Sequence, residues 1–443
     1  MERYSAYKES LVDWIGSIPS HWEIKKLKYL AKVQTGNTPP KDNEDNYDEQ
    51  GSPWVKPNDL KEFAPITETQ ERLSSQGIQL ARLVPKGSVL VCCIGSIGKL
   101  GIAGNQVCTN QQINSLIFNN LAHLDFAKYM VYASTEEHNQ KADGNVVKIL
   151  NSGKQKNIQY CIPPLPEQEA IASYLDRKTK QIDDLIAKKE RLIELIKEER
   201  AAIINQAVTK GLDPDIPMKD SGIEWLGEIP ENWKTTPLKA IIRELKSGVS
   251  VNSEDTPVAG DEIGILKTSC VYNYYFEPEE NKKVLPEEHD RVACPVTQGC
   301  IIISRMNTPN LVGASGFTEK EYSNLYLPDR LWITEFFSHL QLDAKWLSYI
   351  FVSDSFRSEL SSKATGTSPS MKNISKEDLL TIKVPYPDHV MQEEIRTFID
   401  DYHTQTTKQV ARYRKQIDLL KEYKTTLISE AVTGKIDIRN IER

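Results

Sequence analysis

The chain has 443 residues, of which 39% are hydrophobic and 26% are charged, and its formal net charge is −7. This length predicts two or three domains, and the negative charge argues mildly against a protein that coats nucleic acid by bulk attraction, although local basic patches remain compatible with it. Because no run of about 18 apolar residues occurs, we expect no membrane-spanning helix.

The first residues and the cysteines indicate the compartment. Residues 1–4 (MERY) are too polar for a secretory signal. The seven cysteines include no C-x-x-C pair, which is typical of reduced thiols rather than of disulfides or zinc ligands. We therefore expect a cytoplasmic protein.

A sequence repeat begins near the N-terminus. Residues 8–19 (KESLVDWIGSIP) match residues 219–230 (KDSGIEWLGEIP), and Trp22 matches Trp233, both at an offset of 211 positions (230 − 19 and 233 − 22). The repeat predicts two copies of a globular unit related by approximate two-fold symmetry. Because the segment at residue 8 resembles the linker at residue 219, we also expect the two ends of the chain to lie close together.

The first copy continues with short strands and polar loops. Residues 87–94 are predicted as a buried strand, a helix is predicted from about 125 to 140, and a polar segment at 143–157 leads into a last strand. The second copy follows the same path, with 299–304 in place of the buried strand and 343–362 in place of the helix. Because the scaffold is shared and the loop residues are not, we expect the two copies to recognise two different things.

A long charged helix follows each copy. Residues 163–168 (PPLPEQ) begin the first, and no proline or glycine then occurs before Gly211. Such a helix is about 65 Å long at about 1.5 Å per residue. Residues 385–434 repeat the pattern at an offset of 224 positions (392 − 168 and 431 − 207).

Apolar residues at steps of three and four predict a contact seam on each long helix. The predicted seams are Ile182, Leu185, Leu192, Ile196 and Ile203 in the first helix, and Val410, Tyr413, Ile417, Leu420 and Leu427 in the second. A helix this long and polar needs a partner, so we expect the two helices to pair as an antiparallel coiled coil.

The predicted fold class is α+β, with two globular domains separated by two long antiparallel helices that form a coiled coil, in a pseudo-two-fold tandem repeat. The predicted segments are a first globular domain at 1–162, a first helix at 163–212, a second globular domain at 213–386 and a second helix at 387–443.

The sequence shows no catalytic or metal-binding constellation. Residues 95–99 (GSIGK) resemble part of a phosphate-binding loop, but Cys93 and Leu100 stand where that loop needs a glycine and a Ser or Thr. The histidines never fall at metal-ligand spacing. An Asn-Pro-Pro-aromatic motif, which would hold a flipped base for methyl transfer to its amino group, is absent. We therefore expect a chain that is not itself an enzyme.

The loops instead carry side chains that suit base edges and phosphates. Asn and Gln can pair with adenine, Arg and Lys with guanine, and glycine lets the backbone approach phosphates closely. Any solvent-facing turn has a similar composition, and Gln111 and Gln112 could equally tie strand ends together. The candidate DNA-binding residues are Asn37, Lys99, Asn110, Gln111, Lys148, Lys154 and Lys156 in the first copy, and Lys246, Lys267, Arg305, Asn307, Asn310, Lys363 and Lys372 in the second.

The order of these motifs resembles one family over nearly the whole chain. A G-x-I-P-x-x-W motif, a variable unit, the PPLPEQ motif and a long helix, all repeated, are similar to the specificity subunit of type I restriction–modification systems. The resemblance implies two target-recognition domains, each for one half of a bipartite DNA sequence, and a coiled coil that spaces them. The second copy departs from the pattern at residues 387–392 (PDHVMQ) and at residues 305–307 (RMN).

The resemblance also implies partners and cofactors. Two modification subunits would dock on the coiled coil and methylate adenine with S-adenosylmethionine, and restriction subunits would use ATP and magnesium for translocation and cleavage. This chain would bind double-stranded DNA and none of those cofactors.

Two other interpretations remain open. A non-catalytic protein-interaction scaffold would carry two protein-binding domains on the same coiled-coil spacer, and salt-dependent DNA binding would distinguish a DNA-recognition subunit from it. A fused modification–specificity protein would need a methyltransferase domain, for which the chain has no room.

Overall fold

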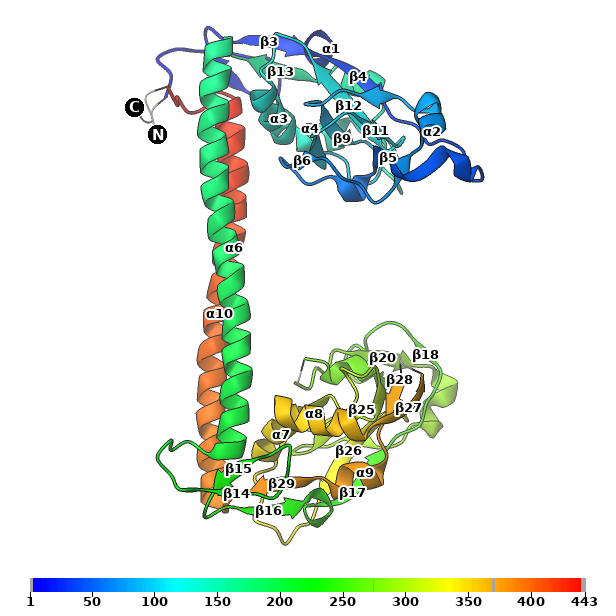
Figure 1. Ribbon diagram of the computed structural model, residues 1–443, viewed down its shortest axis with the longest axis vertical. Coiled ribbons are helices and arrows are strands. Elements are labelled where there is room, and N and C mark those ends of the chain that lie inside the picture. The colour runs from blue at the N-terminus through cyan, green and yellow to red at the C-terminus, as the bar shows by residue number, and fades with distance from the viewer. Residues whose placement is uncertain (1–2, 274, 369–370, 440–443) are drawn as a thin grey trace. The chain divides into compact units, whose positions relative to one another are not determined.

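Two compact units make up the computed structural model, which describes residues 3–273, 275–368 and 371–439. Unit 1 comprises Met1–Lys189 and Arg414–Arg443, and unit 2 comprises Glu190–Tyr413 (Figure 1). Each unit thus holds one globular part and a stretch of both long helices. The four segments predicted from the sequence remain a prediction. The two units do not test them, because each unit combines a globular part with parts of both helices.

Unit 1 contains two sheets of its own beside its hairpins. The five-stranded sheet has the order β4-β12-β9-β10-β6, and the four-stranded sheet has the order β7-β5-β11-β8. The strand predicted at 87–94 is confirmed as β9, which is buried along its whole length. The strands are β4 (Ala31–Thr35), β5 (Tyr47–Val55), β6 (Pro65–Ile66), β7 (Arg72–Leu73), β8 (Leu83–Val84), β9 (Val89–Cys92), β10 (Leu100–Ala103), β11 (Val107–Thr109) and β12 (Ile113–Phe118).

Besides two two-stranded sheets, the described part of unit 2 contains three larger sheets, with the orders β17-β26-β22-β24, β18-β20-β19-β25-β21 and β23-β28-β27. Its buried strand β22 takes the place of β9. The strands are β17 (Ile242–Ser247), β18 (Ser253–Glu254), β19 (Gly264–Leu266), β20 (Asn281–Val284), β21 (Pro295–Val296), β22 (Ile301–Ser304), β23 (Met306–Asn307), β24 (Ser315–Phe317), β25 (Tyr322–Tyr326), β26 (Leu331–Phe336), β27 (Thr365–Ser368) and β28 (Met371–Asn373).

The sequence repeat is confirmed by two pairs of matching structures. An antiparallel hairpin of β1 (Tyr7–Glu9) and β2 (Ser17–Pro19) in unit 1 corresponds to one of β14 (Met218–Asp220) and β15 (Glu228–Pro230) in unit 2. The strands before the long helices also pair alike: β3 (Glu23–Lys26) with β13 (Gln159–Ile162), and β16 (Lys234–Pro237) with β29 (Lys383–Tyr386). Trp22 and Trp233 are buried in the cores of their units.

The helix predicted at 125–140 is two helices, and so is its counterpart in unit 2. The breaks fall at Ser134 and Ser353, whose hydroxyl groups each donate a hydrogen bond of 2.8 Å to the carbonyl three residues earlier. A serine hydroxyl that bonds to the backbone competes with the helical pattern, which explains the two breaks. The short helices are α1 (Leu27–Leu30), α2 (Ser75–Leu80), α3 (Leu124–Ala133), α4 (Thr135–Lys141), α5 (Ser152–Gln155), α7 (Ala344–Val352), α8 (Asp354–Lys363) and α9 (Lys376–Thr381), and the 3-10 turns are η1 (Glu44–Asn46), η2 (Pro57–Asp59), η3 (Leu238–Ala240), η4 (Thr268–Val271) and η5 (Pro286–Arg291).

The two long helices are α6 (Leu165–Lys210) and α10 (His389–Val432). Gly211 follows the first with φ +79°, and Gly434 lies just beyond the second with φ +71°. Glycine adopts this left-handed conformation without the steric cost that a Cβ brings, so both helices end where the sequence predicted. No helix among the described residues has an apolar stretch long enough to cross a membrane.

The helices pair antiparallel within each unit, as predicted. In unit 1, Lys189 bonds to Gln416 at 2.7 Å and Asp183 to Lys424 at 2.8 Å, so residue numbers rise along one helix as they fall along the other. In the core of unit 2, Val208 near the end of α6 shares a cluster with Ile395 near the start of α10.

The predicted seam is correct on α10 and partly wrong on α6. Ile182 and Ile196 are buried, but Leu185 and Leu192 are 46% and 41% exposed, and their neighbours Ile186 and Ile193 turn inward instead. Apolar residues stand side by side at 185–186 and 192–193, so a step of three and a step of four fitted the sequence equally well. The burial pattern shows that the step of four is the one used.

Candidate nucleic-acid interface

Four loops that carry predicted contact residues of unit 1 meet where β9 ends. The amide of Cys93, just after β9, bonds to the carbonyl of Gln112 at 2.7 Å, and the amide of Gly95 bonds to the carbonyl of Lys148 at 3.1 Å. The amide of Asn37 bonds to the carbonyl of Thr109 at 3.0 Å. Four loops, near residues 37, 95, 111 and 148, are thereby held together.

Two predicted residues support these loops from within. Asn110 is buried, and its amide group donates to the side chain of Gln112 at 2.9 Å and accepts from the backbone of Gln112 at 3.1 Å. Asn37 donates to the carbonyl of Leu80, and its backbone carbonyl accepts from the indole of Trp54 at 3.3 Å. These bonds give both side chains a structural task, and their contact with DNA remains a prediction.

The other five predicted residues of unit 1 lie at or near the surface. Lys99 is exposed and donates to the carbonyl of Pro57 at 2.7 Å, while the amide oxygen of Gln111 accepts from Thr38. Lys148 is exposed, and Lys154 forms an ion pair with Asp143. Lys156 is half-buried, and its carbonyl accepts from the amide of Lys28 at 3.0 Å.

In unit 2, five predicted residues lie on or beside the small sheet β23-β28-β27. Asn307 pairs with Lys372 in register, and Lys372 donates to the carbonyl of Ala364, next to Lys363, at 3.2 Å. The carbonyl of Asn310 accepts from Arg357 of α8 at 2.9 Å. Arg305 immediately precedes β23. The sequence could not place these residues together, because β23 is far from its sheet partners along the chain. β27 begins 58 positions after the end of β23 (365 − 307), and β28 begins 64 positions after it (371 − 307).

Arg305 and Asn307 differ in whether their side-chain nitrogens already have hydrogen-bond partners. Asn307 is buried and donates to the hydroxyl of Tyr272 at 2.7 Å, and its oxygen accepts from the backbone of Thr308 at 2.9 Å. The Nε of Arg305 is buried without a hydrogen-bond acceptor. A buried guanidinium nitrogen without an acceptor carries a desolvation cost that a ligand atom or a water would relieve.

The remaining two predicted residues of unit 2 lie elsewhere in ion pairs. Lys246, at the end of β17, pairs with Glu335 at 2.6 Å. Lys267 pairs with Asp255 at 3.3 Å, and hydrogen bonds from Lys282 and Lys267 lower the pKa of that exposed carboxyl group. Both lysines are half-buried or exposed at the surface, and neither is brought to the small sheet.

Known proteins resemble this chain over its whole length. A family model described as the type I restriction modification DNA specificity domain matches residues 19–195. The MjaVIII specificity subunit of Methanocaldococcus jannaschii is 24% identical over 445 residues, which cover 96% of this chain and 95% of that subunit. Residues 19–195 thus match the type I specificity domain, and the chain as a whole is similar to type I restriction enzyme specificity subunits.

Other known proteins match a part of the chain or its fold alone. The MjaIX specificity subunit of the same archaeon is 27% identical over 190 residues, so the match spans 43% of that subunit and 42% of this chain. A solved structure titled as the basis of complex assembly and conformational transition of the type I R-M system has a TM-score of 0.68 at 14% identity, and the match covers 95% of this chain and 99% of that one. This likeness shows the fold.

The glutamine of each proline–glutamine motif makes the same pair of hydrogen bonds in the two units. Gln168 accepts from the amide of His123 at 2.7 Å and donates to the carbonyl of Pro163 at 2.9 Å. Gln392 does the same with Asp343 at 3.0 Å and with the carbonyl of Pro387 at 3.0 Å. The weak second motif thus keeps the glutamine that joins the start of the long helix to the N-terminal end of α3 in unit 1 and of α7 in unit 2.

A second repeated contact escaped the sequence reasoning. Tyr129 of α3 donates to Asp176 of α6 at 2.7 Å, and Tyr349 of α7 donates to Asp400 of α10. Burial and the neighbouring carboxylate raise the pKa of each tyrosine, so both remain protonated donors. The two aspartates are 224 positions apart (400 − 176), so the repeat offset was the signal that could have found them.

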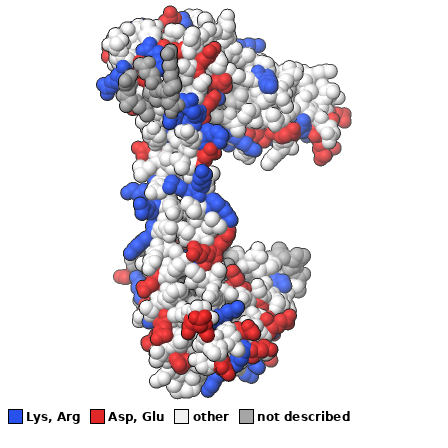
Figure 2. All heavy atoms as spheres, turned by 60° about the vertical axis from the view of Figure 1, so that its left-hand side comes forward, with Lys and Arg blue, Asp and Glu red and all other residues white. Residues whose placement is uncertain are grey.

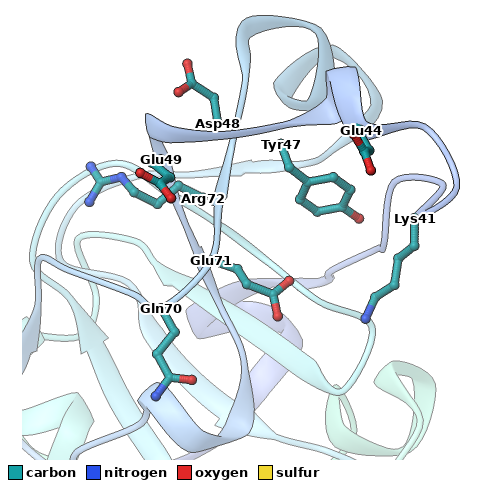
Figure 3. Close-up of a pocket in the computed structure, with 8 residues that line it drawn as sticks. All are labelled: Lys41, Glu44, Tyr47, Asp48, Glu49, Gln70, Glu71 and Arg72. Carbon is teal, nitrogen blue, oxygen red and sulfur yellow. The ribbon is translucent and has the colours of Figure 1, made fainter.

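A hollow of about 400 Å³ in unit 1 lies outside the predicted interface (Figure 3). Its lining includes Glu44, Asp48, Glu49 and Glu71, with Lys41 and Arg72 as the basic residues. An acidic lining disfavours phosphate. No group of three or more His, Cys, Asp or Glu in the described part of the chain is arranged to hold a metal ion.

Proposed function

We propose that this chain is the DNA-recognition subunit of a type I restriction–modification complex. Each unit recognises one half of a bipartite target. The observation that supports this most is a repeated scaffold with unlike loops. The Gln168 and Gln392 contacts are the same in both units, whereas the loops near Lys148 have the small sheet around Arg305 in their place. Two copies of one scaffold with different loops suit a target whose halves differ.

The proposal includes the partners implied by the family. Two modification subunits dock on the paired helices and methylate adenine with S-adenosylmethionine, and restriction subunits use ATP and magnesium. This chain contributes recognition and binds none of those cofactors. The DNA of the cell is the substrate, so the proposed compartment is the cytoplasm.

The charge distribution supports weak DNA binding by the chain alone. The net charge is −7, and the face drawn in Figure 2 mixes Lys and Arg with Asp and Glu over the globular parts. Phosphate contacts release counterions and supply most of the non-specific affinity for DNA. A chain with scattered basic side chains therefore needs partner subunits to hold the duplex.

The test is selection from random duplexes by the full-length chain bound to its modification subunits, followed by mapping of methylated adenines in the source cell. We expect one bipartite sequence from both measurements, with a fixed spacer between the halves. Binding without sequence preference, or without dependence on salt, would overturn the proposal and favour the protein-interaction scaffold. Adenine methylation by the purified chain alone would contradict its non-catalytic role.

A further inference from the structure

An apolar loop tip projects from unit 1 beside the predicted DNA contacts. Val146 is 98% exposed, Val147 is 51% exposed and Ile149 is 45% exposed. Single exposed apolar residues are normal on a protein surface. Three within four positions of one loop expose a continuous apolar area to water, which the packing of the fold does not require.

The loop is closed and held in place. The amide of Asp143 bonds to the carbonyl of Ile149 at 2.9 Å, and the amide of Ile149 bonds back to the carbonyl of Asp143 at 2.7 Å. Gly144 has φ +106°, and a Cβ there would lie 2.2 Å from the carbonyl oxygen of Val147. Only glycine fits this position, so the sequence preserves a tight turn that presents the two valines to solvent.

The surroundings of the tip are cationic and polar. Lys148 is exposed next to it, and its carbonyl holds the glycine loop at Gly95. Lys154 pairs with Asp143 at the base of the loop. Exposed Gln111 lies on the neighbouring loop, which Cys93 joins to the same strand end. An apolar partner surface would remove Lys148 from water without offering it a charge, whereas the phosphates that flank a DNA groove would pair with it.

A DNA major groove presents one apolar group on its base edges, the C5-methyl group of thymine. We infer that Val146 and Val147 pack against a thymine methyl group in the half-site recognised by unit 1, while Lys148 contacts the flanking phosphates. This inference rests on the proposed function. It assigns to unit 1 a base preference that hydrogen-bonding side chains alone do not supply.

The test replaces each thymine of the preferred target, one at a time, by deoxyuridine, which lacks only the methyl group. The full-length chain bound to its modification subunits should bind one such duplex about fourfold more weakly, as expected for one lost buried methyl group. The double variant Val146→Ala, Val147→Ala should bind the thymine and deoxyuridine duplexes equally. Because Val146 is almost fully exposed, its truncation removes little internal packing.

Leu11→Ala is the matched control, since Leu11 is 93% exposed in the same unit and lies in the hairpin between β1 and β2. This variant should keep the full sensitivity to deoxyuridine. A target whose halves lack thymine, or a wild type that ignores every substitution, would overturn the inference while leaving the proposed function intact. Loss of modification-subunit binding in the valine variant, with unchanged DNA preference, would show that the tip contacts protein instead. Absence of any preferred sequence would sink the proposed function itself.

Discussion

The same position of the repeat holds a cation in both units, but the cation has different partners. Lys424 of unit 1 and Arg200 of unit 2 are 224 positions apart (424 − 200). Lys424 is buried between Asp183 at 2.8 Å and Glu62 at 3.3 Å. Burial lowers the pKa of Lys424, but its bonds to Asp183 and Glu62 outweigh that effect and raise the pKa above the ordinary value.

An aromatic contact is common to both units, since Lys424 also lies over the ring of Phe63, 5.5 Å from its centroid, and the two ion pairs are what distinguishes Lys424. The guanidinium of Arg200 lies over the ring of Tyr275, 4.9 Å from its centroid, and the hydroxyl of Tyr275 lies 3.1 Å from Nδ1 of His403. In both units a residue from a globular loop meets the paired helices at this cation. The helices thus supply a contact point at the same repeat position, while the loop that meets it differs between the units, which suits a scaffold whose loops recognise different targets.

The largest expected effect concerns what the two units share. Trp22→Ala and Trp233→Ala should each lower the free energy of unfolding of their own unit by about 3–5 kcal/mol, because each removes a buried indole from a packed core. Hydrogen exchange resolved by peptide should show the loss in one unit at a time. Equal loss in both units for either variant would show that they unfold as one.

Arg305→Ala probes a residue that belongs to unit 2 alone. If its guanidinium pairs with a guanine, the variant should lose about 1–3 kcal/mol of binding free energy and relax one base position. Selection from random duplexes measures this. Lys239→Ala, an exposed lysine of the same unit, is the control and should leave the preferred sequence unchanged. A uniform loss across all sequences would make Arg305 a phosphate contact.

Lys424→Met should remove the ion pairs of unit 1 while it keeps most of the apolar stem. We expect a loss of about 1–2 kcal/mol of unfolding free energy, since Asp183 and Glu62 are more than half exposed and water can solvate them. Because the folded pKa is raised, this stabilisation is present below the unfolded pKa and is lost only as pH rises through the folded value. Lys421→Met, an exposed neighbour on α10, is the control.

Acid should affect unit 1 more than unit 2. Burial lowers the pKa of His138 to about 4, and burial and Arg200 lower that of His403 to about 4. Both folded values lie below the ordinary 6.5, so the stability of the neutral forms is present above pH 6.5 and is lost as pH falls toward 4. His138 is fully buried, so its protonation should lower the unfolding free energy of unit 1 by about 1–2 kcal/mol. His403 is partly exposed, so solvent screens its charge and the effect on unit 2 should be smaller.

Hydrogen exchange at pH 5 and pH 7 measures the acid effect in each unit. His138→Gln should make unit 1 less sensitive to pH, and His403→Gln should do so to a smaller extent for unit 2. An acid response that both variants leave unchanged would assign it to other groups.

The smallest effect is expected from moving the ends of the chain. Arg439 lies 4.8 Å from the ring centroid of Tyr4, so the first and last described stretches of the chain lie close together, as predicted. A circular permutant with a short linker across these ends and new ends near Asp215 should change the unfolding free energy of unit 1 by less than about 0.5 kcal/mol. Thermal unfolding measures this, and failure to fold would show that the connection at residue 215 is needed.

The tandem repeat, the ends of the long helices and the resemblance to a known family can all be read from the sequence. Each of these features is written along the chain: the repeat in matching residues, and the helix ends in Gly211 and Gly434. The α+β class and the antiparallel pairing followed from them and are confirmed. The helix breaks at Ser134 and Ser353 were missed, because serine is tolerated inside many helices and only the observed side-chain bonds distinguish these two.

Which of the candidate side chains are exposed to a ligand depends on the packing of the folded chain. Asn110, Asn307 and Gln111 were all predicted as DNA contacts because they are amide side chains in polar loops. The first two are buried, whereas Gln111 is exposed. Packing also selected Ile186 and Ile193 over Leu185 and Leu192 for the helix contact, and it left Val146 in solvent. The physical reason is that burial depends on partners far away in the chain, such as Glu62 and Lys424, which no local pattern of residue types can bring together.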